Sequence, residues 1–361
     1  MRSDARARRY WRVALFAWLP LVVAELVRVF VFHRAHDWTL FDLSLHVRLL
    51  FALPMMLLAE GLLERTARSA MNSFYKGKFC DDALVDRIVA RANALRDSAW
   101  VEGLLAGSAL IGGQLALWNV LGAAGLVHGG ESSGTWSVPR LWYAVVALPL
   151  VQFVTLRWMW RWVIWTYVLA RLSRLPLFLL ATHADGASGL AVLARPVSAF
   201  SLFVLACSSI LAAAWSTQVL ATRATVASLL PLLGGFLLVA LALALGPLLF
   251  LSVHLFRARR KTLAQYGDFV RDYGLEFHAK WIDPRTARGS ALGAQDIQSF
   301  NDLGQAYQVA AKSRLFVFTS RNVAAVWFAG VLPMVPLVAS TLTLEVVLKK
   351  ILGTIMGGLT L

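Results

Sequence analysis

The sequence predicts an all-α fold, a polytopic transmembrane helical bundle of about seven spans with a small cytoplasmic helical layer. Stretches of about twenty apolar residues recur along the 361-residue chain, and each is long enough to cross roughly 30 Å of hydrocarbon as a helix. Hydrophobic residues make up 58 % of the chain and charged residues 15 %, whereas about a quarter of a soluble domain is charged. The bilayer is therefore the expected solvent for most of this protein.

The apolar stretches define the candidate spans, and the last of these stretches contains two prolines. Pro333 and Pro336 each remove a backbone donor, so this final stretch is either a kinked crossing followed by an interfacial helix over 345–361 or a re-entrant hairpin. We favour the crossing. The seven candidate spans are residues 13–32, 43–63, 101–126, 141–168, 199–221, 229–256 and 323–342.

The distribution of lysine and arginine predicts the orientation of these spans. With the N-terminus inside, the three short outer connections hold only Arg34, Arg140 and Arg223, whereas the N-terminal arm and the inner connections hold about twenty-six basic residues. Cytoplasmic connections of membrane proteins carry this excess of positive charge. We therefore expect a multi-pass protein of the bacterial inner membrane with a cytoplasmic N-terminus. The basic residues before the first apolar run are typical of an uncleaved signal anchor.

The spans and their connections divide the chain into five parts. Residues 1–65 form the N-terminal arm with the first two spans, 66–99 a cytoplasmic helical connection, 100–256 four transmembrane helices, 257–321 a cytoplasmic helical segment, and 322–361 the C-terminal transmembrane or re-entrant helix with its interfacial tail.

The two long inner connections are each predicted to form helices. In the first, Asp81 and Asp82 can accept the free N–H groups of a first turn. In the second, apolar residues at alternating steps of three and four form a seam that must be buried against another helix, and a helix starting at Asp296 is the expected partner. The first connection places Val85, Ile88, Ala92 and Leu95 on one face; the seam is Leu263, Tyr266, Val270, Tyr273 and Phe277; the second helix presents Ile297, Phe300, Gly304, Tyr307 and Ala311.

Ionisable groups inside the apolar spans are the candidate functional residues. A charge at this depth costs on the order of 3 kcal/mol, and such groups mark transport pathways when they face the interior of a bundle. Structural ion pairs, snorkelling to the interface and an aromatic belt with arginines are the alternatives that we keep open. The transport-pathway candidates are Glu25, Arg28, His46, Arg48, Glu60, Arg157 and Arg161.

No motif in the sequence indicates an enzyme, a cofactor or a metal centre. Zinc-binding and phosphate-binding patterns are missing from the sequence, and the serine of Gly130-Glu131-Ser132-Ser133-Gly134 lies in an outer connection without the strand and helix that such a nucleophile needs. His183 and Asp185, in a cytoplasmic loop, could ligate a metal or act in catalysis, but a turn in which Asp185 binds its own backbone is the favoured interpretation.

Three segments of the chain resemble a known group of sequences. These are the loop His183-Ala184-Asp185-Gly186, the helix that carries Tyr266-Gly267 and ends at Lys280-Trp281, and the run Asp296-Ile297-Gln298-Ser299 with Asp302-Leu303. Together they resemble a group of uncharacterised bacterial polytopic inner-membrane proteins, over roughly residues 180–350. The resemblance implies a bacterial inner-membrane setting and no particular reaction. Where the group has His-Pro-Asp, this chain has His-Ala-Asp.

These observations favour a non-enzymatic inner-membrane protein that forms an ion channel or transport pathway, with anions preferred because arginine predominates among the intramembrane charges. The alternative is a membrane scaffold or partner-binding subunit without transport activity. The expected partners are the lipid bilayer, further copies of the chain and a cytoplasmic protein; nucleic acid is not expected, because the basic residues lie at helix ends and form no single soluble surface. No cofactor is expected.

Overall fold

The structure is a computed structural model that describes residues 2–30, 43–123, 138–222, 226–283 and 295–337. Every regular element in these ranges is helical. The α-helices are α1 (Arg2–Phe30), α2 (Leu43–His46), α3 (Leu53–Lys76), α4 (Asp82–Arg96), α5 (Ala99–Ala123), α6 (Val138–Trp142), α7 (Leu148–Leu172), α8 (Val197–Thr222), α9 (Leu230–Leu249), α10 (Ser252–Phe277), α11 (Gln295–Ala311) and α12 (Ser320–Val331). Short π-helical or 3₁₀ segments are η2 (Val47–Ala52), η3 (Tyr143–Ala147), η4 (Leu190–Ala194), η5 (Val226–Leu229), η6 (His278–Ile282) and η7 (Leu332–Met334).

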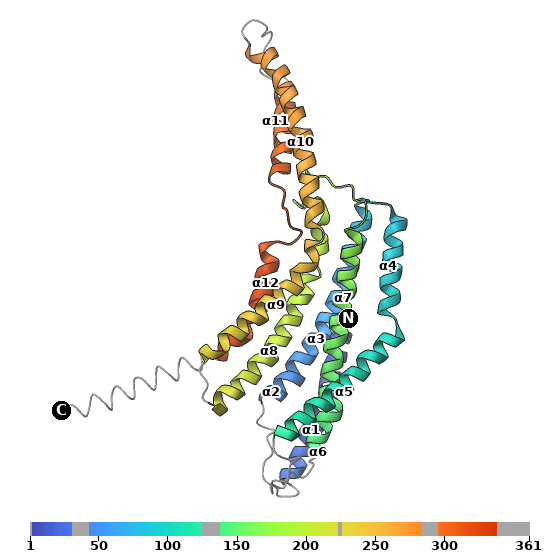
Figure 1. Cartoon of the computed structure of the whole chain (residues 1–361), viewed down its shortest axis with the longest axis vertical. Helices are drawn as coiled ribbons and strands as arrows, with labels where there is room; N and C mark the ends of the chain where they lie inside the picture. Colours follow the sequence, from blue (N-terminus) through green and yellow to red (C-terminus); the bar gives the residue numbers. More distant parts are fainter. Residues whose placement is uncertain (1, 31–42, 124–137, 223–225, 284–294, 338–361) are drawn as a thin grey trace, which may run out of the picture.

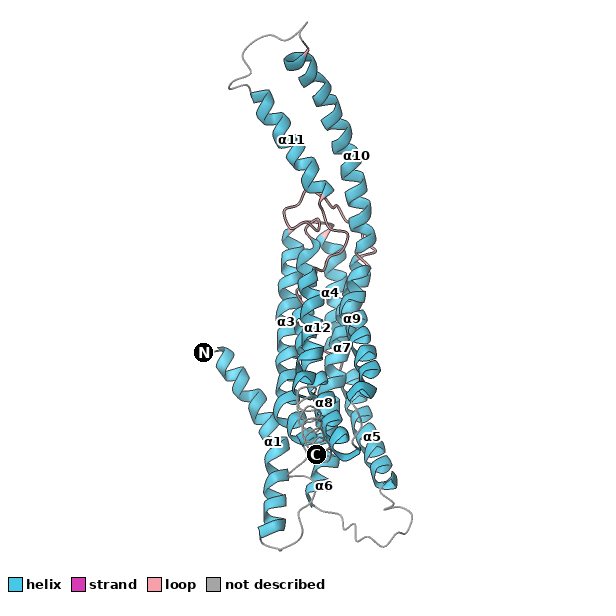
Figure 2. Cartoon of the chain, turned by 90° about the vertical axis from the view of Figure 1, so that its left-hand side faces the viewer, coloured by secondary structure: helices cyan, strands magenta, loops and turns pink. Residues whose placement is uncertain are grey.

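The molecule is an elongated bundle from which one hairpin projects. α10 and α11 run side by side away from the remaining helices at one end (Figures 1 and 2). The opposite end of the bundle holds the last residues of α1, α5 and α8 and the first residues of α2 and α6 (Figure 1). The all-helical class with a helical layer beyond the bundle is thus as predicted.

Among the described residues, five helical stretches are long and apolar enough to cross a membrane. They coincide with the first, second, fourth, fifth and sixth predicted spans. The third and seventh predicted spans, 101–126 and 323–342, continue into residues outside the described ranges, so the expected total of about seven spans is not confirmed. The predicted interfacial tail 345–361 and the outer connection that contains Ser132 also lie outside the described residues. The five stretches are Arg9–Arg28, Leu43–Lys76, Tyr143–Leu172, Leu190–Val219 and Leu230–Leu249.

The sixth predicted span, 229–256, is interrupted in the structure. α9 ends at Leu249 and α10 begins at Ser252. Pro247 lies inside α9 and cannot donate to the carbonyl of Leu243, four residues earlier. The indole Nε1 of Trp162 donates to this carbonyl at 3.0 Å, so α7 satisfies the acceptor that the proline leaves free. Hydropathy alone did not reveal this break, because both sides of it are apolar.

Two other prolines follow π-helical turns. Leu53-Pro54 comes directly after η2, and Leu148-Pro149 directly after η3. Because a proline nitrogen cannot donate, the turn before it loses one backbone hydrogen bond, and a wider turn is one way to accommodate the loss. A π-helical turn therefore precedes the proline in both the second and the fourth predicted span.

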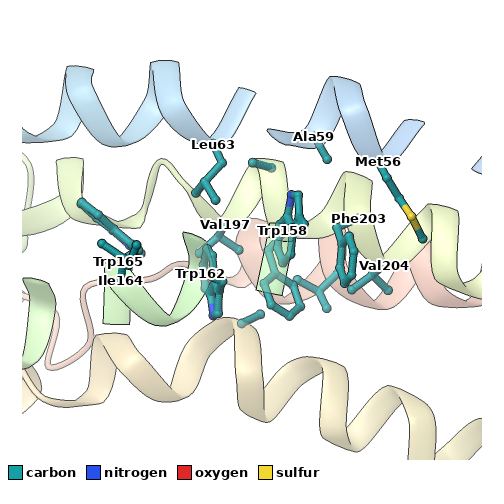
Figure 3. Packing of buried hydrophobic residues seen from close by; sticks show 14 of the residues in the cluster. Met56, Ala59, Leu63, Trp158, Trp162, Ile164, Trp165, Val197, Phe203 and Val204 are labelled. Atoms are coloured by element: carbon teal, nitrogen blue, oxygen red, sulfur yellow. The ribbon is translucent and has the colours of Figure 1, made fainter. Parts of the chain in front are cut away.

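Aromatic packing between α7 and α8 forms the centre of the bundle. The rings of Trp158 and Phe203 stack at a centroid distance of 3.8 Å and an interplanar angle of 2°, and Phe200 packs edge-on against both Trp158 and Trp162 (Figure 3). Trp158 is completely buried. α8 also packs against α3 and α12, so it is the helix around which the others assemble.

The helices predicted for the connections 66–99 and 257–321 are present in the structure. The Asp81 carboxylate accepts the Ala83 N–H at 3.0 Å at the start of α4, and Val85 and Ala92 are buried. Tyr273 and Phe277 of α10 stack on Phe300 of α11, at 6.0 and 4.9 Å between ring centroids.

One detail of the second prediction differs from the structure. α11 begins at Gln295, so Asp296 lies in its first turn, and its carboxylate binds Lys280 and Trp281.

We expect Trp158→Ala to lower the free energy of unfolding by about 3 kcal/mol or more, because it leaves a cavity at a fully packed aromatic centre. Chemical denaturation of the detergent-solubilised protein measures this loss. Trp100→Ala is the matched control, since Trp100 is 88 % exposed. Equal losses in the two variants would contradict the central role of the aromatic cluster.

Candidate functional site

Three of the predicted intramembrane charges meet between α3 and α7. Glu60 Oε2 accepts from Arg157 Nη2 at 2.7 Å, and Glu60 Oε1 lies 2.9 Å from Arg161 Nη2. Only 8 % of the Glu60 side chain is exposed. Each carboxylate oxygen therefore has its own guanidinium, which is the strong, charge-assisted form of pairing.

The local sequence explains why this cluster forms. Arg157 and Arg161 lie four residues apart on α7, so they project from one face of the helix. Two like charges on one face need an acidic partner, and α3 supplies it. Glu64, one turn beyond Glu60, lies 3.9 Å from Arg161, and the Arg157 guanidinium also lies 5.5 Å from the centre of the Phe153 ring.

The other acidic candidate, Glu25, is paired within its own helix. Glu25 is fully buried on α1, and its Oε2 lies 3.8 Å from Arg28 Nη1, one turn further along. This is the structural ion pair that was the alternative interpretation of a charge inside a span. The pair neutralises charge inside an apolar stretch whether or not it has a further role.

His46 and Arg48 bind aromatic residues of other helices. Trp18 Nε1 of α1 donates to His46 Nδ1 at 2.9 Å, and Arg48 Nη1 of η2 donates to the hydroxyl of Tyr143, the first residue of η3. These contacts connect α1, the start of the second span and the start of the fourth. They hold the helices together at the level where both π-helical turns occur.

The loop that contains His183 and Asp185 is an ordered turn built around one carboxylate. Asp185 Oδ1 accepts the N–H groups of Ala187 and Gly189, both at 2.9 Å, and Oδ2 accepts that of Ala191 at 3.0 Å. His183 Nδ1 lies 2.9 Å from Asp185 Oδ1. The favoured interpretation of Asp185, a residue that binds its own backbone, agrees with these contacts.

Burial alone would raise the pKa of Asp185, but the three backbone donors and His183 outweigh it, so the net shift of the pKa is downward.

Arg314, in the segment between α11 and α12, attaches this loop to the hairpin. Its side chain donates to the Asp185 carbonyl, and its backbone N–H donates to the Gly186 carbonyl at 2.7 Å. Gly186 and Gly189 adopt positive φ of 66° and 87°, which favours glycine. The loop thus joins the α7–α8 connection to the base of the hairpin. In the described residues, His183 and Asp185 belong to no group of three or more metal-ligating side chains.

A cavity of about 370 Å³ lies next to the Glu60 cluster, between α3, α4 and α7. Of the seven transport-pathway candidates, Arg161 lines it. The remaining cationic lining comes from Arg68 of α3 and Arg96 of α4, and most of the other lining side chains are apolar. The arrangement combines an apolar floor with guanidinium groups, which suits an amphiphilic anion.

Comparison with protein-family models, with curated proteins and with solved structures finds no match for this chain. The resemblance described in the sequence analysis therefore stays an expectation, and the site is judged on its own geometry.

Several partners of the predicted residues were not identified from the sequence. Trp18, Tyr143 and Arg314 each bind a candidate residue from a distant part of the chain. The i, i+4 spacing of Arg157 and Arg161 was the available signal for an acidic partner. No local pattern pointed to Trp18 or Tyr143, since their contacts depend on how separate helices pack.

We expect Glu60→Gln to lower the free energy of unfolding by about 3 kcal/mol, because two partly buried guanidinium groups lose their shared counter-charge. Titration with a denaturing detergent measures the effect. Glu64→Gln removes a carboxylate that is 44 % exposed, and it should cost less than about 1 kcal/mol. If both variants lose the same stability, the Glu60 pairing is not the dominant interaction between α3 and α7.

The Asp185 turn should depend on pH. A lowered folded-state pKa means that the ionised carboxylate stabilises the turn above the unfolded pKa, about 3.9, and that this contribution is lost as the pH falls through the folded value. Asp185→Asn should speed amide exchange at Ala187, Gly189 and Ala191 by roughly tenfold at neutral pH. The difference from the parent protein should shrink at acidic pH.

Hydrogen–deuterium exchange over a pH series measures both effects. Asp302→Asn, on the exposed side of α11, is the control that should leave these amides unchanged. A difference between Asp185→Asn and the parent that does not vary with pH would rule out this carboxylate as the titrating group.

Proposed function

We propose that this chain is a membrane-anchored scaffold subunit whose α10–α11 hairpin binds a helical partner protein. The supporting observation is that the hairpin extends beyond the bundle and cannot bury its own seam. Over residues 263–283 and 295–309, no side chain is fully buried, although the seam is aromatic and apolar. Two helices alone leave such a seam open along both edges, and one or two added helices would close it.

Exposed apolar side chains on the hairpin support the same proposal. Phe269 is 60 % and Leu275 65 % exposed, and Ile282 and Ile297 are exposed as well. The seam from Leu263 to Phe277 covers 15 residues, about 22 Å at the helical rise, which is about four turns of contact for a partner helix. A helix rich in exposed apolar residues away from the membrane is a common interaction surface.

The charges on the hairpin indicate its side of the membrane and the chemistry of its partner. Its base is basic, which supports a cytoplasmic location under the positive-inside rule. In the described residues farther out, acidic side chains outnumber basic ones. A partner helix with an apolar stripe flanked by basic residues would complement it. The base carries Arg257, Arg259, Arg260, Lys261, Lys312 and Arg314; the outer acidic residues are Asp268, Asp272, Glu276, Asp283, Asp296 and Asp302, with Arg271 and Lys280 as the basic ones.

Within the bundle, the ionisable groups support a structural role. Glu60 is shared by Arg157 and Arg161, Glu25 is paired with Arg28, and His46 and Arg48 bind aromatic partners. Charges that neutralise one another between packed helices hold those helices together and do not require a water-filled path. This is why we prefer the scaffold to the ion channel favoured by the sequence, which stays a competing proposal.

The test of the scaffold is residue-specific photocrosslinking in cells, with the crosslinker at Phe269 or Leu275. We expect one defined protein adduct from each hairpin position. Phe269→Glu combined with Leu275→Glu should abolish the adduct from a crosslinker at Ile297 while leaving the thermal stability of the bundle unchanged. Photoreactive residues at Leu104 and Leu238, exposed on α5 and α9, are the controls and should not give that adduct.

Ion flux into liposomes that contain the purified protein tests the competing proposal. The scaffold predicts no flux above that of empty liposomes. Two results together would overturn the scaffold in favour of a conduction pathway. They are an ion flux that Glu60→Gln abolishes and the absence of any adduct from the hairpin positions.

A further inference from the structure

We propose that the cavity between α3, α4 and α7 binds an anionic phospholipid, with the phosphate at its guanidinium groups and an acyl chain along its apolar floor. The cavity measures about 370 Å³, within the range of small-ligand sites. Leu63, Met71 and Val89 are among the apolar side chains that line it, and Ile164, Trp165 and Val168 of α7 complete the floor.

The cationic groups of the cavity outnumber its acidic group. Arg68, Arg96 and Arg161 line it together with one carboxylate, Glu64. Asn72 and Asn93 add neutral hydrogen-bonding groups. Guanidinium groups match the geometry of phosphate, so three of them around one cavity favour an anion whose oxygens accept hydrogen bonds from them.

Each of the three arginines keeps donors for a ligand. Arg68 uses Nη2 to bind Glu64 at 2.9 Å, and Arg161 uses Nη2 to bind Glu60. Arg96 uses Nε and Nη2 to bind Asp97, at 2.8 and 2.9 Å. A guanidinium has five N–H donors, so these ion pairs position the side chains and leave further N–H groups for phosphate oxygens.

The level of the cavity along the bundle favours a lipid. The stretch Leu43–Lys76 is 34 residues long, about 50 Å at the helical rise, which exceeds the roughly 30 Å of hydrocarbon. Its cavity-lining part begins at Leu63, about 30 Å from Leu43, and so lies at the headgroup level of one leaflet. Tryptophans at the same level are typical of this interface: Trp160 Nε1 binds the Leu95 carbonyl at 3.3 Å, and Trp100 is exposed just beyond α4.

The experiment measures the thermal midpoint of the purified full-length protein in a neutral detergent with added phosphatidylglycerol, phosphatidylcholine or inorganic phosphate. We expect phosphatidylglycerol to raise the midpoint by several degrees and the other two to leave it within a degree of the starting value. An equal rise with phosphatidylcholine, or a full rise with inorganic phosphate, would overturn the proposal, because the first needs no anionic recognition and the second needs no lipid.

Variants test the cavity directly. Arg68→Gln combined with Arg96→Gln should weaken phosphatidylglycerol binding at least tenfold. Ala67→Leu, which fills part of the cavity without changing charge, should also reduce the rise in the midpoint. The control is Arg87→Gln combined with Arg91→Gln, which removes the same charge from the α3–α4 region outside the cavity and should retain the full response. Loss of the response in this control, or its retention in both cavity variants, would refute the site.

Discussion

The Glu60 carboxylate, buried between α3 and α7 and shared by Arg157 and Arg161, is the interaction on which the arrangement of this bundle depends. In an apolar solvent an unpaired charge is expensive, so each charged helix face must lie opposite its counter-charge. This requirement sets which helices are neighbours and aligns them along the bundle. Trp158 follows Arg157 on α7, and its ring stacks on Phe203 of α8, which packs α8 against the pair.

The same constraint connects the bundle to the cavity. Because Arg161 is held by Glu60, its guanidinium stays at the edge of the space between α3, α4 and α7. α4 closes that space from the side through the contact between Trp160 and the Leu95 carbonyl. A structural ion pair and the proposed lipid site are compatible uses of one arginine, since a guanidinium has more donors than the pair with Glu60 uses.

The hairpin of α10 and α11 has a different source of stability. The two helices project beyond the bundle, and Tyr273 and Phe277 of α10 stack on Phe300 of α11. The loop around Asp185 and the contacts of Arg314 join its base to the bundle. A base joined to the bundle and an incompletely buried seam farther out are consistent with the proposed binding of a partner helix.

From the sequence we could predict the helical class, most of the apolar spans, the Asp81 cap, the aromatic seam and the Asp185 turn, because these depend on periodicity, hydropathy and contacts within a few residues. The three-dimensional packing of the helices was needed to reveal that Arg157 and Arg161 meet Glu60, that Trp162 satisfies the Leu243 carbonyl freed by Pro247, and that α4 encloses a cavity with α3 and α7. These contacts join residues about eighty to a hundred positions apart in the chain, or three separate helices. No local pattern encodes them, since they arise when packed helices bring their charged and polar groups to the same level of the bundle.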